Sequence, residues 1–463
     1  MDNLMQYPLS ETNFMEIIKQ YLLSGIDPGN SDVKISYLTP TGEVKDLSIS
    51  TCIAKAPSEP IMQGKRNDDP TDWLHVEISA SNGAFPRGFY YVGPIAKLSP
   101  ERTEATEGNN KATSDVHLIT MIVAEAVAAL ESGYTGTVYA PPSCGLPILD
   151  IKGRQATVFL GRLRGTFTVR FLDGKFKGTT ITIVHEIPED AAVDDYIHAE
   201  AIQCTLGLGF KVEDFEVVEN DMAELVDQDV VISDAGGGTF DIAVYENESL
   251  NPEASRTYTE TLPELAQIEQ AKMFAGLKVG ANDYIDTIMK EAIPEIRSQL
   301  EALELPTVDS TYYFRGRNDF ITKVLKPYTK KLKEGKLQKG KPEITFSTMG
   351  VDIDLTTVVK PHLEKYGNVL YWTNFLARQQ EGAAGIANNI MTGGGVLLGY
   401  VVLKDKQVNA KGIRMYTLPD DLFAAPYTNS RGYLYSSMLT HEEIIGLLKG
   451  NHEKLKQSNT TVE

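Results

Sequence analysis

Cysteine and histidine are scarce in this chain. Its 463 residues include three cysteines, Cys52, Cys144 and Cys204, which lie far apart and form no CxxC pair. The seven histidines form no cluster, and His441-Glu442-Glu443 is not the HExxH sequence of a zinc enzyme. A disulfide framework and a zinc site are therefore disfavoured, and the cysteine usage indicates a reducing cytoplasm.

Long hydrophobic runs are also missing. The longest apolar stretches, such as Met121–Leu130, contain a glutamate and are much shorter than the about 20 residues that a membrane-spanning helix needs. The first residues, MDNLMQYPLSETN, lack a basic segment followed by an apolar core, so no export signal is expected. The sequence predicts a cytoplasmic protein without a membrane span.

Basic residues are few relative to acidic ones. Lysine and arginine total 44 against 63 aspartates and glutamates, which gives a net charge of −19 and an isoelectric point near 4.9. A surface this acidic repels a phosphate backbone, so the main body is not expected to bind nucleic acid directly. A connection to DNA would need a basic partner.

The segment Lys323–Lys341 is a local exception to the acidic composition. It contains eight lysines and a single glutamate. A run of like charge is usually a solvated face, so a lysine-rich hairpin or loop is the first interpretation. The alternative is a contact patch for an acidic neighbour, such as another copy of the same protein.

Two similar strand–turn–strand units are present, about 207 residues apart (Asp27 to Asp234). In each, an apolar strand ends in an aspartate, a glycine-rich turn follows, and a second strand returns. The composition, with 42% hydrophobic and 23% charged residues, is that of a globular protein, and the length suggests two to four domains of about 150 residues. We therefore expect two similar α/β domains that face each other.

The two glycine turns have the chemistry of a phosphate clamp. Glycine allows the backbone N–H groups to approach phosphate oxygens, and an aspartate at the strand end is suited to hold Mg²⁺ through water. No GxxxxGK[ST] loop is present, which disfavours a P-loop enzyme. A third cluster, Gly393, Gly394 and Gly395, follows another apolar strand and would let the backbone pack against a base, ribose or α-phosphate. The clamp residues are Asp27, Gly29, Asn30, Ser31 and Lys34 in the first half, and Asp234, Gly236, Gly237, Gly238 and Thr239 in the second.

These three motifs resemble those of the actin, heat-shock chaperone and sugar kinase superfamily. The sequence from Asp234 to Asp241, DAGGGTFD, is similar to its second phosphate motif, GIDPGNSDVK (residues 25–34) to its first, and IMTGGG (residues 390–395) to its adenosine motif. Within the superfamily the chain resembles the bacterial actin-like proteins of the ParM type. The resemblance implies an α/β, actin-like fold of two ribonuclease-H-like domains around a nucleotide cleft. The expected domains are residues 1–226 plus 401–463 and residues 227–400.

The resemblance also implies roles for individual residues. Asp27 and Asp234 are expected at the metal, Lys34 on the phosphates, and Gly280 beside the ribose. Glu189 occupies the position of the group that orients the attacking water, so Glu189 and Asp234 are the expected catalytic residues. The distance of 45 residues from Glu189 to Asp234 is longer than the connection that the family suggests. Glu219 is therefore a rival for the water-orienting position.

The function that the resemblance implies is a filament-forming actin-like ATPase. It would bind ATP or GTP with Mg²⁺, couple hydrolysis to self-association, and move plasmid DNA through a basic DNA-binding adaptor. A small-molecule kinase and a chaperone-like ATPase are the alternatives within the superfamily. Only 31 residues follow Gly432, which is too few for a substrate-binding domain of a chaperone.

Overall fold

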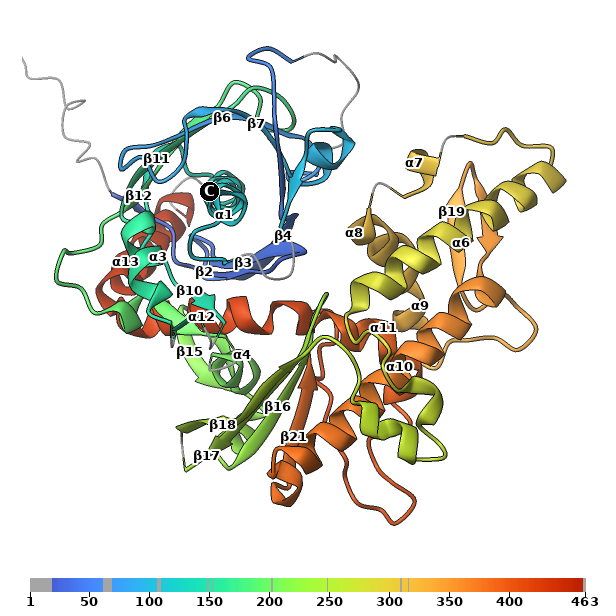
Figure 1. The fold of residues 1–463 in the computed structure, drawn as a ribbon. Helices are drawn as coiled ribbons and strands as arrows, with labels where there is room; N and C mark the ends of the chain where they lie inside the picture. Colours follow the sequence, from blue (N-terminus) through green and yellow to red (C-terminus); the bar gives the residue numbers. More distant parts are fainter. Residues whose placement is uncertain are drawn as a thin grey trace, which may run out of the picture.

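Two α/β units lie side by side, and the chain crosses between them twice (Figure 1). The computed structural model describes residues 19–60, 69–105, 110–147, 150–151, 153–200, 203–247, 249–308, 310–314 and 316–460. The chain enters the second unit after α4 (Cys204–Gly209) and returns to the first through α12 (Thr428–Thr440). The mixed sheets and helices confirm the α/β class.

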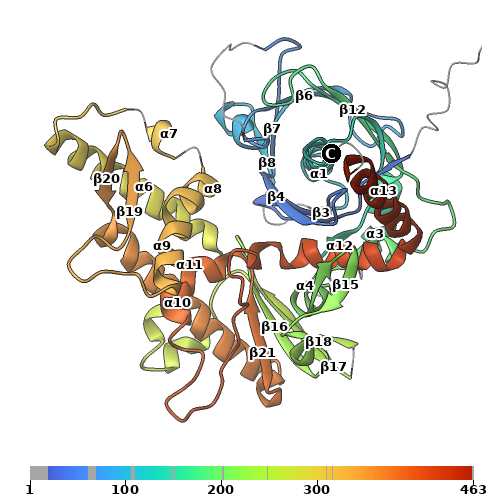
Figure 2. The same cartoon turned by 180° about the vertical axis from the view of Figure 1, so that it is seen from behind.

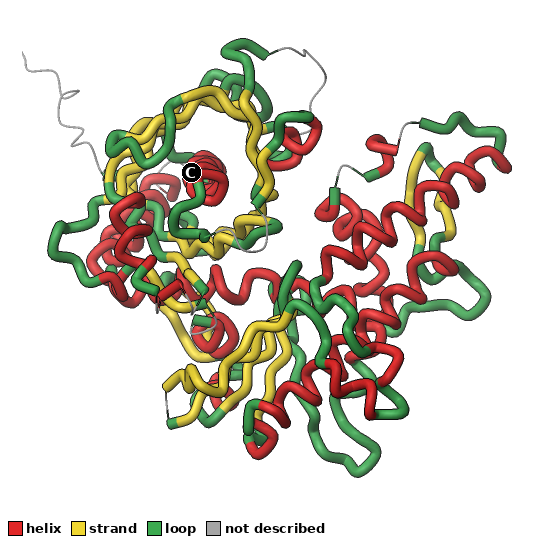
Figure 3. The backbone as a smooth tube through the Cα atoms, in the orientation of Figure 1, coloured by secondary structure: helices red, strands yellow, loops and turns green. Residues whose placement is uncertain are grey.

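Two sheets of the first unit curl around helix α1 (Asp115–Glu131), as Figures 1 and 3 show. The α1 sequence is apolar on all sides because strands surround it, and nearly all of its residues are buried. The eight-stranded sheet has the order β1 (Gln20–Tyr21), β9 (Gly136–Tyr139), β12 (Thr180–His185), β11 (Gly165–Phe171), β6 (Leu74–Ala80), β7 (Gly88–Val92), β5 (Cys52–Lys55) and β8 (Thr103–Glu104). The five-stranded sheet has the order β13 (Ile197–Ala199), β10 (Cys144–Leu146), β2 (Ser24–Pro28), β3 (Asp32–Leu38) and β4 (Val44–Ser50).

The second unit contains a smaller sheet and most of the long helices (Figure 3). Its four-stranded sheet has the order β18 (Ser249–Tyr258), β17 (Phe240–Glu246), β16 (Val230–Ala235) and β21 (Asn388–Thr392). The β16–β17 pair is antiparallel and β21 runs parallel to β16. The remaining elements are α6 (Ala281–Ala302), α7 (Ser310–Tyr313), α8 (Arg317–Phe320), α9 (Lys326–Lys333), the hairpin β19 (Thr345–Thr348) and β20 (Val351–Asp354), α10 (Thr356–Gln380) and α11 (Gly394–Leu403).

The structure of the lysine-rich segment differs from the hairpin or loop that the sequence suggested. A turn of π-helix, Ile321–Leu325, runs directly into α9, so the first half of Lys323–Lys341 is helical and not a hairpin. Val324, Leu325 and Tyr328 are buried, whereas Lys330, Lys331 and the lysines after the helix are exposed. Few apolar residues anchor this helix, so their helical spacing is hard to recognise in a sequence that is mostly lysine.

Part of the chain beyond residue 400 packs with the second unit. Leu403, Tyr416 and Leu418 are buried in the core of the second unit. Thr417 hydrogen-bonds to strand β21, donating from its N to Asn389 O (2.7 Å) and accepting at its O from Met391 N (2.9 Å). The return to the first unit therefore begins at α12, where Leu434, Tyr435 and Met438 join a cluster with Leu23.

The segments around the crossing complete the described chain. The hairpin of β14 (Phe210–Glu213) and β15 (Glu216–Glu219) and the short helix α5 (Ala223–Val226) follow α4, and α13 (Glu442–Thr460) follows α12 (Figure 2). Helix α3 (Gln155–Leu163) lies in the first unit. Within the described ranges, every helix is too short or too polar to cross a membrane.

Helix α12 lies in backbone contact with both β2 and α4. A Cβ atom on Gly25 of β2 would lie 2.1 Å from Leu434 N and from Ser430 O. A Cβ on Gly207 would lie 2.0 Å from Thr428 O, and one on Gly432 would lie 1.8 Å from Gln203 O. Because backbone atoms cannot rotate away, glycine at these positions sets how closely the two crossing helices approach the strand that carries Asp27.

We expect Gly25→Ala to lower the free energy of unfolding by about 1–3 kcal/mol, because the added methyl group must push α12 away from β2. Urea denaturation followed by circular dichroism would measure this change. Gly161→Ala is the matched control, since nothing lies within 4 Å of its Cβ position in α3. Alanine in a helix interior should leave stability unchanged or raise it by up to about 1 kcal/mol. Equal stability of the Gly25→Ala variant and the wild type would contradict the close α12 contact.

Candidate functional site

The two glycine turns, from opposite halves of the sequence, touch each other. Asn282, in the first turn of α6, donates from Nδ2 to Ser31 Oγ in the β2–β3 turn. Its backbone N donates to Gly237 O in the β16–β17 turn (2.9 Å). A Cβ on Gly237 would lie 2.7 Å from Ser31 Oγ. The structure thus brings the predicted clamp residues of both units to one place.

Lys34 and Asp27 face each other across the first hairpin. They are paired in the β2–β3 register, and Lys34 Nζ lies 3.4 Å from Asp27 Oδ2. Burial lowers the pKa of Lys34, but the carboxylates of Asp27, Asp234 and Asp32 raise it above its ordinary value. Lys34 therefore stays charged, and it interacts electrostatically with aspartates from both hairpins.

Asp234 and Asp241 are paired in the β16–β17 register and form the acidic part of the second hairpin. Asp234 Oδ2 accepts from Asn429 Nδ2 of α12 at 3.0 Å. Burial, together with the neighbouring Asp241, raises the pKa of Asp234 to about 6. Burial also raises the pKa of Asp241 to about 6, against hydrogen bonds from Thr257 and Thr239 that act to lower it.

The third glycine cluster packs against the second hairpin. Gly393 has a positive φ of 91°, and a Cβ there would lie 2.0 Å from Asp234 Oδ1. A Cβ on Gly395 would lie 2.4 Å from Tyr366 Oη, and one on Gly280 would lie 2.5 Å from Gly237 O. A Cβ on Gly394 would make only an ordinary van der Waals contact, with Pro426 Cβ at 3.9 Å. Close packing around the clamp thus accounts for three of these glycines, but not for Gly394.

Glu200 and Lys111 complete the acidic site, and nothing in the sequence marked them. Lys111 is buried, and its Nζ donates to Glu200 Oε1. Burial raises the pKa of Glu200, as do the charges of Asp27 and Asp234, while Lys111 lowers it. The pKa of Lys111 is lowered by burial but raised, on balance, by Glu200 and Asp27. The pair therefore lies within electrostatic reach of both hairpins.

The two glutamates named from the sequence lie at the end of, or after, strands outside the five-stranded sheet that carries Asp27. Glu189 is exposed in the loop after β12, which belongs to the eight-stranded sheet, and Glu219 is exposed at the end of β15. Glu200 instead follows β13, which pairs in parallel with β10, and β10 pairs in parallel with β2, the strand of Asp27. Glu200 therefore follows a strand of the sheet that carries Asp27, whereas Glu189 does not.

Asn30 is held from the side by helix α1. His117 donates from Nε2 to Asn30 Oδ1 (3.1 Å) and accepts at Nδ1 from Ser114 Oγ (2.9 Å). Burial and the charge of Lys111 lower the pKa of His117 to about 3, so the imidazole is neutral. The first turn is therefore fixed by a neutral histidine and carries no additional charge from it.

The charges of this site set what it can bind. Asp27, Asp234, Asp241 and Glu200 outweigh Lys34 and Lys111, so a phosphate ester could enter only with a cation. No three carboxylate, imidazole or thiol groups converge as direct ligands within the residues described. The residues fit a hydrated Mg²⁺, which keeps several waters and needs only one or two carboxylates nearby.

Similar proteins were found by comparing structures and not by comparing sequences. No protein-family model matches the sequence, and no curated protein does. *Bacillus thuringiensis* ParM solved with ATP is similar at 29% identity and a TM-score of 0.68, over 91% of this chain and 99% of that chain. The same ParM with ADP is similar at 27% identity and a TM-score of 0.66, over the same shares. The actin-like protein Alp7A matches at 16% identity and a TM-score of 0.58, over 96% of this chain and 99% of its own, which supports the fold only.

One further match is a larger protein. This chain spans 48% of a *Bacillus thuringiensis* hybrid that contains two ParM mutants, with 28% identity over 91% of this chain. The two-unit fold, the opposed glycine turns and these matches define an actin-fold protein. Within that class, the chain is a ParM-like protein.

The raised pKa of Asp234 predicts a pH-dependent gain in stability for Asp234→Asn. The folded chain holds the proton up to about pH 6, whereas the unfolded chain loses it near pH 4, so ionisation destabilises the folded state as the pH rises. At about pH 7.5 the variant should be more stable by about 1–3 kcal/mol, and at about pH 4 the difference should vanish. Thermal unfolding of the nucleotide-free protein at both pH values would test this, with exposed Asp190→Asn as the control. A gain that is equal at both pH values would contradict a buried, ionised Asp234.

Proposed function

We propose that this protein is a nucleotide-dependent, filament-forming ATPase of the bacterial cytoplasm. The observation that carries the proposal is the contact of Ser31 with Asn282 and Gly237, which unites a phosphate-type turn from each unit. The similar ParM structures that hold ATP, ADP or AMPPNP support a nucleoside triphosphate as the ligand. ATP is the proposed nucleotide, and GTP remains the alternative that the assembly test below includes.

The proposed roles follow from the contacts at the site. The amides of the two turns would bind phosphate oxygens, and Lys34 would neutralise their charge, since it is held between aspartates of both hairpins. Asp27 and Asp234 would hold Mg²⁺ through water, and the bound ion would neutralise charge that develops on the phosphates. Glu200 would orient the attacking water, because it is the carboxylate that lies within reach of both turns without belonging to either.

Coupling of hydrolysis to assembly would run through the two crossing helices. Asn429 of α12 joins Asp234 Oδ2 to Cys204 Sγ of α4, so α12 contacts the aspartate of the second hairpin directly and α4 reaches it through Asn429. A change at the phosphates would therefore alter the angle between the units, and that angle sets the fit of successive subunits in a polymer. The proposed structural units are residues 1–226 with 428–463 and residues 227–427, which moves the second boundary from residue 400 to the start of α12.

The cellular role that we propose is the segregation of plasmid DNA. The ParM-like fold favours this role, and the net charge of −19 requires that DNA be held indirectly. A basic DNA-binding adaptor on a centromere-like site would meet both conditions.

We expect Glu200→Gln to slow nucleotide hydrolysis by about 10²–10⁴-fold, because the neutral amide cannot accept a proton from the attacking water. Binding of a fluorescent ATP analogue should be retained, which separates a catalytic loss from misfolding. Glu189→Gln is the control and should hydrolyse at the wild-type rate, since this side chain is exposed away from the turns. A normal hydrolysis rate for Glu200→Gln, or a large loss of hydrolysis for Glu189→Gln, would show that Glu200 is not the residue that orients the attacking water.

Sedimentation tests the proposed assembly. The chain should pellet with Mg²⁺ and ATP, and it should stay in the supernatant without nucleotide or with ATP and excess EDTA. Without the ion, the triphosphate meets a net negative site and the units cannot close on it. A parallel series with GTP gives the nucleotide preference. Identical sedimentation in all samples, or none in any, would exclude a nucleotide-gated filament and favour a small-molecule kinase or chaperone-like ATPase.

A further inference from the structure

A projecting hairpin, Gln407–Met415, connects α11 to the segment that leads back to α12. Figures 1 and 2 both show this loop extending past the end of β21, at the side of the second unit away from the first. Its arms are joined by the antiparallel bridge Val408–Arg414 and by Met415 N donating to Gln407 O at 2.7 Å. The hairpin is outside the candidate nucleotide site.

The tip of this hairpin is an ordered turn. Asn409 N donates to Ile413 O (2.9 Å), and Asn409 Oδ1 accepts from Lys411 N (2.9 Å) and Ile413 N (3.0 Å). Gly412 supplies the positive φ of 77° that the turn needs, and its N donates to Asn409 O (2.9 Å). The conformation of the tip is thus determined by its own hydrogen bonds.

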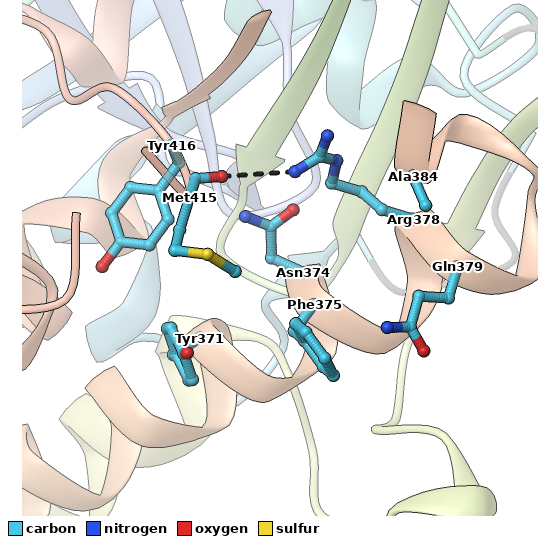
Figure 4. Close-up of a pocket in the computed structure, with 8 residues that line it drawn as sticks. All are labelled: Tyr371, Asn374, Phe375, Arg378, Gln379, Ala384, Met415 and Tyr416. Carbon is cyan, nitrogen blue, oxygen red and sulfur yellow. Dashed lines mark hydrogen bonds between the residues drawn. The ribbon is translucent and has the colours of Figure 1, made fainter. Parts of the chain in front are cut away.

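The base of the hairpin is anchored to α10 and β21. Figure 4 shows Arg378 of α10 reaching Met415, and Nη1 donates to Met415 O at 3.2 Å. Asn389 Nδ2 of β21 donates to the same carbonyl at 2.9 Å. Tyr416, directly after the hairpin, donates from its hydroxyl to Leu403 O at 2.7 Å. Because base and tip are already ordered, docking of this hairpin would cost little conformational entropy.

The exposed surface of the hairpin combines apolar and basic side chains. Val408 is 49% exposed and Ile413 57% exposed, and the backbone bonds place them on facing arms. Lys411 and Arg414 are exposed, and no carboxylate among the described residues forms an ion pair with either. The chain contains no acidic residue from Lys406 to Pro419. Two branched apolar side chains flanked by unpaired cations on a rigid projection form a contact surface for an acidic partner.

We propose that the Gln407–Met415 hairpin docks onto an acidic surface of a second copy of this chain. The proposal rests on the proposed filament function. A copy with a net charge of −19 carries an excess of acidic side chains, and two such chains repel each other unless a basic surface lies between them.

The charges also determine the symmetry of this contact. A two-fold contact between hairpins would place Lys411 and Arg414 beside their own copies, and like charges at an interface are repulsive. The hairpin must therefore meet a different surface of the second copy. Such a head-to-tail contact does not close on itself as a dimer does, and its repetition produces an open filament.

The first test measures the critical concentration for nucleotide-dependent sedimentation. The double variants Val408→Ser/Ile413→Ser and Lys411→Glu/Arg414→Glu should each raise it by at least about tenfold, while ATP-analogue binding and Tm stay at wild-type values. The charge variant should also make assembly less sensitive to salt. The controls are Leu98→Ser, an exposed apolar position in the first unit, and Lys339→Glu in the lysine-rich segment. An unchanged critical concentration for both hairpin variants would overturn the proposal, as would an equal loss in the controls.

The second test identifies the receiving surface. All three native cysteines are buried, so Ile413→Cys would accept a benzophenone–maleimide label selectively. Photocrosslinking of the assembled polymer, read by mass spectrometry, should join Cys-labelled hairpins to an acidic segment outside residues 407–415 of another copy. Crosslinks between two hairpins would overturn the proposed contact, and so would a polymer that sediments but gives no crosslink from the labelled hairpin to another copy. Neither result would affect the filament function. Failure of the wild-type chain to sediment with any nucleotide would instead reject the filament function on which the contact rests.

Discussion

The repulsion among four carboxylates at the junction of the two units is the constraint on which the rest of the structure depends. Asp27 and Glu200 come from the first unit, and Asp234 and Asp241 from the second. Burial and mutual repulsion raise the pKa of both aspartates of the second hairpin to about 6. Lys34 and Lys111 offset only part of this charge, so the junction keeps an excess of acidic groups.

The close packing of glycines around the junction is what keeps these charges near one another. Gly25, Gly207 and Gly432 allow α12 to contact β2 and α4 through backbone atoms, and Gly280, Gly393 and Gly395 seat the second turn against α6 and α11. A side chain at any of them would separate elements that carry charged groups. The proposed coupling between phosphate chemistry and the angle between the units follows from this geometry, because the same helices contact both.

The hairpin Gln407–Met415 differs in charge from the chain as a whole. The sequence is acidic overall, whereas the anchored hairpin Gln407–Met415 contains no acidic residue and exposes Val408, Lys411, Ile413 and Arg414. The lysine-rich segment is also basic, but Lys330 and Lys331 project from a helix whose apolar side chains are buried beneath them. A solvated lysine face gains little by docking, while exposed valine and isoleucine gain by leaving water.

The sequence by itself determined the features that depend on neighbouring residues. Each glycine turn is local to its hairpin, so Asp27, Asp234 and the turns could be named from the sequence, and their order along the chain indicated the actin-like fold. Glu200 could not be found in this way, because β13 has three residues and acquires its place only by pairing with β10. Strand β12, which precedes Glu189, has the local pattern of a core strand. Its pairing with β11 and β9 nevertheless puts it in the eight-stranded sheet and not in the sheet of Asp27. Tertiary structure decided which strand end lies beside the strand of the first glycine turn, since parallel pairing joins segments that no local pattern connects.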